Sequence, residues 1–309
     1  MYFCIMVCNS CPRRCGVNRS PSLGFCKAPL DLQIASVCRH LGEEPPLVGT
    51  HGICNVFFAH CNLQCVYCQN IDISSPNVDP RFFQTLSINQ LADLIAQTLP
   101  STENILGLVS PSHYVHAIPP LIETLHNRGL FPTVVYNTNA YDSIQSLQLL
   151  EPYIDIYLPD LKYLSPTLSA SLSHASDYPT VATAAILEMV RQKGSALLTD
   201  ESGLAFRGII IRHLVLPDHT DNSKQVLQWI ADHLPTNIHI SLMAQYFPPT
   251  ACDNLPPELS HPLSSNQYND VLSFFNSLQL SRGWVQDLES NNNYRPDFTL
   301  SNPFIHDNT

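Results

Sequence analysis

The sequence is poor in basic residues. It has 15 Lys and Arg against 26 Asp and Glu in 309 residues, which gives a formal net charge of −11, and no basic block occurs. Proteins that bind duplex nucleic acid without sequence preference carry clustered Lys and Arg. We therefore expect no general nucleic-acid-binding role, although a local patch for an RNA substrate stays open.

Long apolar runs are also missing. No stretch reaches about 18 apolar residues, so we expect no transmembrane helix and no membrane partner. The apolar start "MYFCIMVC" has neither a basic leader nor a small-residue cleavage site, which is unlike a signal peptide. The 44% hydrophobic content is enough for a full core. These features predict a cytoplasmic globular protein.

Cysteine, in contrast, is abundant and clustered. In a long chain without a signal peptide, tight Cys groups indicate metal sites in a reducing compartment better than disulfides. Seven of the eleven cysteines fall into two such groups, and Cys38, Cys54 and Cys252 are expected to be small buried residues outside them. The cysteines are Cys4, Cys8, Cys11, Cys15, Cys26, Cys38, Cys54, Cys61, Cys65, Cys68 and Cys252.

Apolar runs of strand length alternate with amphipathic stretches after residue 52. Runs that are apolar on both faces are typical of buried parallel strands. The alternation predicts a parallel sheet, and about six βα units predict a partial (β/α)6 TIM-like barrel with a Cys-rich N-terminal segment. The six runs are 53–59, 105–110, 133–138, 154–160, 208–217 and 237–244.

This pattern divides the chain into three parts. Residues 1–49 show no sustained period and form the Cys-rich N-terminal segment, 50–290 form the barrel, and 291–309 form a C-terminal tail. Helices are expected over 87–99, 116–129, 177–194, 222–235 and 266–280.

Two of these helices carry clear end signals. Ser87 with Gln90 three residues later is a capping-box pattern. Asp177 is a cap candidate with Pro179 in the first turn, and Gly194 is a stop signal. Residues 195–207 predict a hairpin insertion between the fourth and fifth strands.

The stretch "FFAHCNLQCVYCQN" follows the first predicted strand directly. It contains Cys61, Cys65 and Cys68, with Tyr67 just before the last. A [4Fe–4S] cluster usually takes four thiolates, so three would leave one iron open to a ligand. The alternative is a zinc knuckle with His51 or His60 as the fourth ligand. In barrels of this kind the chemistry lies at the carboxyl ends of the strands, where this loop belongs.

This loop resembles the signature of the radical S-adenosylmethionine (radical SAM) enzymes, which is Cys-x3-Cys-x2-Cys with an aromatic before the last Cys. The resemblance implies a [4Fe–4S] cluster on Cys61, Cys65 and Cys68 whose open iron binds S-adenosylmethionine. It further implies reductive cleavage of the cofactor to a 5′-deoxyadenosyl radical, which abstracts hydrogen from a substrate. A flavodoxin or ferredoxin would supply the electron.

Within that superfamily the chain is most similar to relatives of pyruvate formate-lyase-activating enzyme, over about residues 8–290. "NTNAYD" resembles the Asp-Thr-Asn-Gly motif after the third strand, with Asn137 and Ala140 replacing its ends. "LPDLKY" resembles the Asp-Leu-Lys motif after the fourth strand. "IRHLVLPDHTDN", "CPRRCG" and "WVQDL" are also similar. The resemblance implies cofactor contacts by Ser112, Asn137, Thr138, Asn139, Asp160, Lys162 and Arg212.

Two places depart from the family pattern. The Gly-Gly-Glu that binds the cofactor's amino group is replaced by "SPSHY", so Ser112, His113 or backbone carbonyls are the candidates for this contact. A Tyr-His after the sixth strand is replaced by Tyr246 and Phe247, and no His contact carries over.

Structural alternatives stand beside these roles. Asp160 and Lys162 are two residues apart and share a face of a strand, so they could form an ion pair with each other. Asn137 and Asn139 could serve turns instead. Arg212 interrupts an apolar strand and needs a carboxylate, either the cofactor's or a protein Asp or Glu.

The second Cys group is Cys8, Cys11, Cys15 and Cys26. Four thiolates suit a closed site for zinc or for a second [4Fe–4S] cluster. Metal binding would stabilise a segment that has few apolar residues. The alternative is four unligated thiols in a flexible arm.

The expected function is therefore radical SAM chemistry on an unidentified substrate. The resemblance to activating enzymes implies a glycine in a partner protein as the target. Modification of RNA or a peptide is a second enzymatic reading. A non-catalytic iron–sulfur or zinc protein of electron transfer or assembly is the third.

Overall fold

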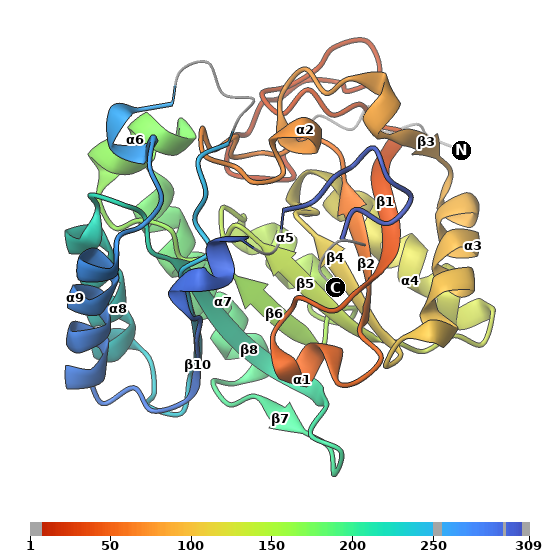
Figure 1. Ribbon diagram of the computed structural model, residues 1–309. Coiled ribbons are helices and arrows are strands. Elements are labelled where there is room, and N and C mark those ends of the chain that lie inside the picture. Colours follow the sequence, from red (N-terminus) through yellow and green to blue (C-terminus); the bar gives the residue numbers. More distant parts are fainter. Residues whose placement is uncertain (1–7, 250–254, 293–294, 305–309) are drawn as a thin grey trace.

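The structure is a computed structural model that describes residues 8–249, 255–292 and 295–304. Cys4, Cys252 and parts of the predicted tail lie outside these residues. The chain has a mixed α/β fold built around one mostly parallel sheet (Figure 1). In the described part of the chain, no helix is long and apolar enough to cross a membrane.

In the described part of the chain, seven strands form a parallel array, and two more extend the sheet antiparallel at one edge. All six predicted strands form, and the sheet order β10-β9-β8-β6-β5-β4-β2-β1-β3 leaves two edges that are not hydrogen-bonded to each other. The parallel strands are β2 (Ile53–Phe58), β4 (Ile105–Val109), β5 (Thr133–Thr138), β6 (Ile156–Pro159), β8 (Ala205–Leu214), β9 (His239–Met243) and β10 (Gly283–Val285).

The sequence suggested that the Cys-rich segment 1–49 is irregular, but part of it forms a strand. Its residues Leu32–His40 form β1, which pairs antiparallel with β2 and with the short β3 (Gln84–Leu86). Leu32, Ile34, Cys38 and His40 are buried, residues 33 and 35–37 are partly buried, and Arg39 is exposed. Because residues 35–37 are small or only partly buried, this strand lacks the clear apolar run by which the other strands were predicted.

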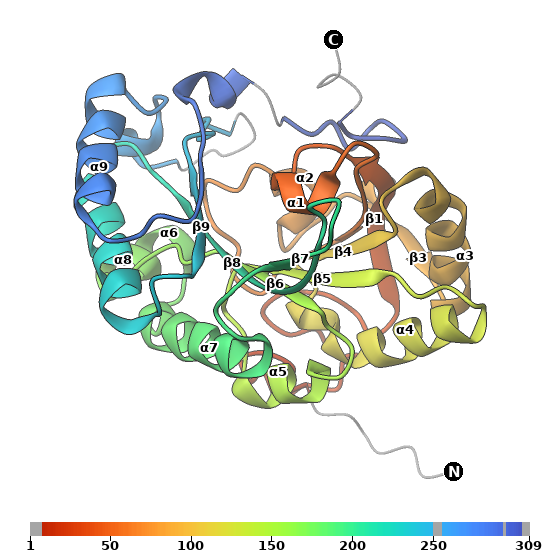
Figure 2. The ribbon, with the colours of Figure 1, turned by 90° about the horizontal axis from the view of Figure 1, so that it is seen from below.

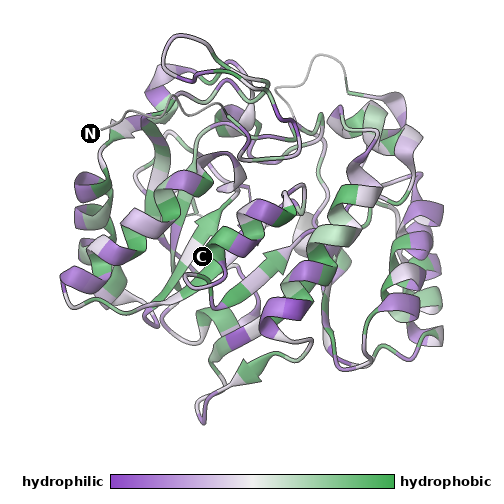
Figure 3. Cartoon of the chain, turned by 180° about the vertical axis from the view of Figure 1, so that it is seen from behind, coloured by the Kyte–Doolittle hydropathy of each residue, from purple (hydrophilic) through white to green (hydrophobic). Residues whose placement is uncertain are grey.

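Helices follow one another in an arc on the outer side of the sheet (Figure 2). Their hydrophilic residues face outward, whereas the strands behind them are mainly hydrophobic (Figure 3). The larger helices are α3 (Ile88–Thr98), α4 (Ile118–Asn127), α5 (Ile144–Leu150), α6 (Pro166–Ser173), α7 (Tyr178–Lys193), α8 (Thr220–His233) and α9 (Ser265–Ser277).

The predicted helix ends are only partly correct. Ser87 and Gln90 form the capping box of α3, and Gly194 ends α7 with φ 82°. Asp177 does not cap α7 with its side chain, because its carboxylate accepts a hydrogen bond from the Tyr141 hydroxyl at 2.8 Å. The predicted hairpin insertion is present, with β7 (Leu198–Thr199) paired to β8.

The sheet separates the two largest hydrophobic clusters of the described residues. The larger one lies between the strands and the outer helices. On the inner face, a smaller cluster joins the first residues of the strands to Leu47 and Val48 of the short α1 (Pro45–Val48). This cluster fills only the amino-terminal part of the inner face, so the carboxyl-terminal part is free for polar groups. Cys38 and Cys54 are buried core residues, as expected.

Candidate functional site

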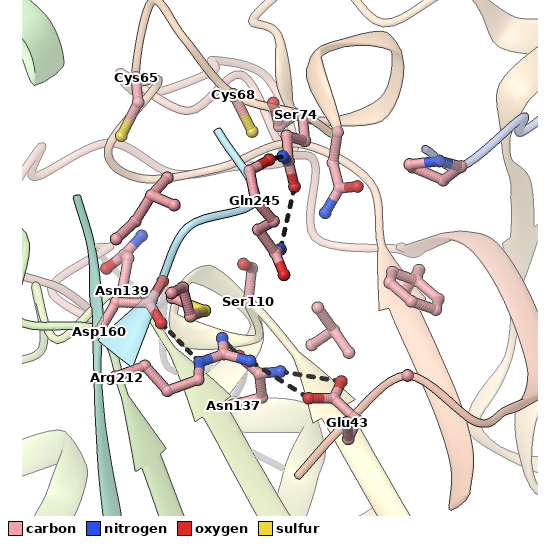
Figure 4. A pocket seen from close by; sticks show the side chains of 18 of the residues that line it. Glu43, Cys65, Cys68, Ser74, Ser110, Asn137, Asn139, Asp160, Arg212 and Gln245 are labelled. Carbon is pink, nitrogen blue, oxygen red and sulfur yellow. Dashed lines mark hydrogen bonds and ion pairs between the residues drawn. The ribbon is translucent and has the colours of Figure 1, made fainter. Parts of the chain in front are cut away.

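A cavity of about 210 Å³ lies on the inner face beside the carboxyl ends of the strands (Figure 4). It is bounded by the three-cysteine loop on one side and by a charged cluster around Arg212 on the other. Of the residues proposed from the sequence, its walls include Cys61, Cys65, Cys68, Asn137, Asn139, Asp160, Lys162 and Arg212. The fold therefore brings eight of these residues to one place.

The three-cysteine loop, residues 59–70, follows β2 and is fastened at several points. His60 and Gln64 adopt positive φ values of 70° and 58°, which let the loop turn sharply. The backbone N–H of Val66 donates to the carbonyl of Leu172 in α6 at 2.9 Å. The buried side chain of Asn62 donates to the carbonyl of Tyr141 at 2.8 Å. These contacts hold the thiols at the edge of the cavity.

Each thiol of the loop receives hydrogen-bond donors from the protein. The backbone N–H of Leu63 and the amide of Asn139 each lie 3.4 Å from Cys61 Sγ. Ser173 donates to Cys65 Sγ at 3.0 Å. Cys68 accepts from Ser74 and from the backbone of Asn70. Donors of this kind stabilise thiolate sulfur, which is the form that binds a metal.

Without a bound metal, burial of the cysteines opposes ionisation of their thiols. It raises the pKa of Cys65 to about 12, although nearby Lys162 acts in the opposite direction. A buried thiol with hydrogen-bond donors aimed at it therefore needs a further positive charge to ionise. A bound metal is such a charge, since it deprotonates a coordinating thiol outright.

The histidines considered as a fourth zinc ligand lie elsewhere. In the described residues no three His, Cys, Asp or Glu side chains are gathered around a single ion position. His51 is mainly exposed and pairs with Glu103, and His60 contacts Gln33. Neither histidine lines the cavity.

Arg212 is the centre of the charged cluster. Its Nε donates to Asp160 Oδ1 at 2.7 Å, and Nη2 donates to Asn137 Oδ1 at 2.7 Å. Its Nη1 lies 3.2 Å from Glu43 Oε2. Asp160 also accepts from Lys162 Nζ at 2.7 Å. Two of the structural roles considered from the sequence are therefore found. Asp160 forms an ion pair with Lys162, and Arg212 forms ion pairs with the carboxylates of Asp160 and Glu43.

The charges in this cluster are strongly coupled. Burial alone would raise the pKa of Asp160, but Arg212 and Lys162 outweigh it and hold that pKa below its usual value. Glu44 behaves differently, because burial raises its pKa against the pull of Arg212. Its Oε2 is buried without a hydrogen-bond partner. The cluster therefore combines Asp160, whose pKa is lowered, with Glu44, whose pKa is raised.

Sequence reasoning missed Glu43 and Glu44. They lie in the connection between β1 and α1, where no local pattern marked them, and both line the cavity. Ser110 was also missed; it directly follows β4 and lines the cavity with a positive φ of 53°. The only signal for Glu43 was the need of Arg212 for a carboxylate, and the partner lies 169 positions away.

The structure does not bring Ser112 or Thr138 to the cavity. Both side chains are almost fully buried. They belong to a hydrogen-bonded group in which Thr138 donates to Asp142 at 2.5 Å and Ser112 lies 3.3 Å from Thr138. Tyr136 donates to the same Asp142 at 2.9 Å. This network supports the wall from behind. His113, the other named candidate for the amine contact, is also buried and donates to the carbonyl of Ala59.

Comparisons with known proteins leave the activity open. No known protein-family profile matches the sequence. An uncharacterized protein of Methanocaldococcus jannaschii is 30% identical over 245 residues, which are 78% of this chain and 66% of that protein.

Some solved structures have a similar chain trace. Streptococcus suis SuiB bound to S-adenosylmethionine matches with 13% identity and a TM-score of 0.49, over 74% of this chain and 48% of SuiB. SuiB bound to its precursor peptide SuiA matches with 14% identity and a TM-score of 0.46, over 75% and 48% of the two chains. This chain thus spans about half the length of SuiB and just under two thirds of the Methanocaldococcus protein.

Proposed function

We propose that this chain is a radical SAM enzyme with a partial (β/α)6 barrel, and that it cleaves S-adenosylmethionine reductively to oxidise a substrate by hydrogen abstraction. Cys61, Cys65 and Cys68 would hold a [4Fe–4S] cluster. When bound, the cluster supplies one electron and an open iron for the cofactor. The proposal rests on residues of this chain and on the resemblance of its Cys loop.

One observation carries the proposal. Three thiols from a single loop, placed after the first parallel strand, border a cavity whose opposite wall is charged. A three-thiolate set is incomplete for a closed metal site, and the adjoining cavity offers space for the missing ligand. A purely structural site would need neither the missing ligand nor the cavity.

The protein groups around Cys61 hold and shield its sulfur. Asn139 donates to Cys61 Sγ and also to Asn62 Oδ1 at 2.9 Å, and its own Oδ1 accepts from the backbone of Tyr141. All the polar atoms of this amide are thus engaged. Asn139 therefore positions the Cys61 thiol, in place of the direct cofactor contact that the family resemblance implied.

Lys162 is the group best placed to bind an anionic part of the cofactor. An ammonium group has three donors, and one is given to Asp160. The guanidinium of Arg212, on the same side, is surrounded by Asp160, Asn137 and Glu43. We therefore assign cofactor-carboxylate binding to Lys162, with Asp160 fixing its position, and a wall-forming role to Arg212 and Asn137.

The chemistry implies a reductant, and the family resemblance suggests a substrate. Reductive cleavage needs an external one-electron donor, so a flavodoxin or ferredoxin of the cytoplasm is the proposed partner. For the substrate we extend the resemblance to activating enzymes and propose a glycyl-radical-type protein target.

The test is cofactor cleavage without added substrate. Anaerobically reconstituted protein, reduced with dithionite and given S-adenosylmethionine, should yield 5′-deoxyadenosine and methionine in equal amounts by mass spectrometry. The Cys61, Cys65 and Cys68→Ala triple variant should yield neither. A Cys38→Ala variant, which alters a buried thiol that does not line the cavity, should retain the activity. Absence of 5′-deoxyadenosine from an iron-loaded wild-type protein would reject the enzyme and favour a non-catalytic iron–sulfur protein.

A further inference from the structure

A second group of thiols is assembled in the N-terminal segment, away from the cavity. Residues 8–31 contain no helix or strand, yet their backbone is folded back on itself. The N–H of Cys8 donates to the carbonyl of Val17 at 2.8 Å, and the N–H of Gly16 donates to the carbonyl of Cys8 at 3.1 Å. The N–H of Phe25 reaches Cys15 Sγ at 3.3 Å. These contacts place Cys8, Cys15 and the neighbour of Cys26 side by side.

Three of the four sulfurs accept a backbone N–H. Cys15 accepts from Phe25, Cys11 accepts from Arg13, and Cys26 accepts from Ala28. In Cys11 and Cys26 the donor lies two residues after the cysteine, as it does for Cys61 and Leu63 in the cavity loop. A thiol is a weak acceptor, whereas such donors suit sulfur that carries charge.

Two of the four thiols, Cys11 and Cys26, are buried, and Cys8 and Cys15 are partly buried. No disulfide joins the four thiols. Four close, reduced thiols in a segment without regular structure are stabilised poorly by burial alone.

The packing around Cys15 leaves no room for a larger residue at position 24. A Cβ on Gly24 would lie 2.8 Å from Cys15 Sγ. Backbone turns beside the cysteines also use unusual conformations, with positive φ at Arg14 (43°), Gly16 (64°) and Lys27 (60°). Such conformations cost energy in non-glycine residues. The segment is therefore shaped around its thiols at an energetic cost that metal binding would offset.

One residue of this segment connects it to the cavity loop. The Arg13 guanidinium donates from Nε to the carbonyl of Asn62 at 2.9 Å, and from its other nitrogens to the carbonyls of Ser173 and His174 at 3.2 and 2.5 Å. It also lies 3.7 Å from the centre of the Phe25 ring. Arg13 lies between Cys11 and Cys15 in the sequence, and Asn62 adjoins Cys61. The two thiol groups are thus joined through one side chain.

We propose that Cys8, Cys11, Cys15 and Cys26 bind a metal centre through four thiolates, and that Arg13 fastens this centre to the loop carrying Cys61. The chemistry suits a thiophilic centre, either one zinc or a second [4Fe–4S] cluster. Because no three such side chains in the described residues are yet gathered around one ion position, binding requires the thiols to turn toward a common centre. The centre is closed and keeps the cavity loop in place.

Metal analysis of the Cys61, Cys65 and Cys68→Ala triple variant isolates this site. The variant leaves the four N-terminal thiols intact, so one zinc or about four irons per chain are expected after anaerobic purification. Adding Cys11→Ser and Cys26→Ser should remove that metal. A triple variant that is folded by circular dichroism and free of metal overturns the proposal. This result does not depend on cofactor cleavage, so it is separable from failure of the proposed activity.

The role of Arg13 has its own test, with its neighbour as the matched control. Hydrogen–deuterium exchange of peptides covering residues 59–66 should become at least roughly tenfold faster in Arg13→Gln, as expected for the loss of even one charge-assisted hydrogen bond. Arg14→Gln, which alters an exposed side chain, should leave the exchange unchanged. Removing the N-terminal metal with a chelator should reproduce the Arg13→Gln result. Equal exchange in the two variants would disprove the connection.

Discussion

The Arg212 guanidinium donates to the Asp160 carboxylate at 2.7 Å, and this contact joins β8 to the residue that follows β6. The backbones are also linked there, because the N–H of Leu161 donates to the carbonyl of Arg212 at 2.9 Å. The side chains are only 14% and 16% exposed. A buried ion pair with several additional hydrogen bonds fixes geometry, and it is costly to disrupt by removing one partner.

Replacing Arg212 should therefore destabilise the fold. Arg212→Gln leaves Asp160 with Lys162 alone and leaves Glu43 without its cation. Removing one partner of a buried pair costs about 3–5 kcal/mol, so the free energy of unfolding in urea should fall by that amount. Arg191→Gln is the control, because the Arg191 side chain is 55% exposed in its ion pairs with Glu151 and Glu188, and ion pairs at the surface contribute little. Equal stability of the two variants would show that Arg212 is free to serve a ligand.

The cluster assignment predicts a spectroscopic loss. Replacing Cys61, Cys65 or Cys68 by Ala should remove the visible absorption of the cavity cluster and its low-temperature EPR signal after reduction, because each thiolate binds a separate iron. Cys54→Ala, in the hydrophobic core, should keep both signals. If the triple variant retained the same EPR signal, the iron would belong to other ligands.

The strands and the thiol loop were predictable because their signals are local. Each of the six predicted strands contains a short run that is apolar on both faces, and the Ser87–Gln90 capping box lies within four residues. The position of Cys61 at a strand end follows from chain order alone, since parallel strands present all their carboxyl ends at one edge. These signals were sufficient to place the site.

The contacts that define the cavity's far wall are not local. Glu43 meets Arg212 across 169 positions, and no neighbouring residue signals that meeting. Ser112 was expected at the cavity, but its side chain lies beside Thr138 behind the wall. Whether a side chain faces the cavity can change from one residue to the next. A motif whose sequence has diverged does not tell which of its side chains face the cavity.

The amide of Asn139 should tune the cluster's reduction potential. Hydrogen bonds to cluster-bound sulfur raise the potential by stabilising the more negative, reduced state. Asn139→Ala removes the donor that lies 3.4 Å from Cys61 Sγ, so the midpoint potential should become more negative while the iron content stays at about four per chain. Asn127→Ala, at the exposed end of α4, is the control. An unchanged potential in Asn139→Ala would limit this residue to holding Asn62.

Buried histidines should make the fold sensitive to acid. Burial lowers the pKa of His113 to about 3 and those of His60 and His213 to about 4, whereas the unfolded chain titrates near 6.5. Between these values the unfolded state binds more protons than the folded state. Stability contributed by the neutral rings is therefore present above about pH 6.5 and is lost as the pH falls toward the folded pKa, by up to about 1.4 kcal/mol per pH unit for each group.

His113 offers the cleanest test of this acid sensitivity. Its Nε2 donates to the carbonyl of Ala59 at 2.8 Å, and Gln can make a similar hydrogen bond without titrating. Urea unfolding between pH 7 and pH 4.5, measured in the Cys61, Cys65 and Cys68→Ala background so that cluster loss does not contribute, should show a shallower decline for His113→Gln than for its parent. His126→Gln, at an exposed position of α4, should decline as the parent does. Parallel curves for all three proteins would mean that folding does not lower the pKa of His113.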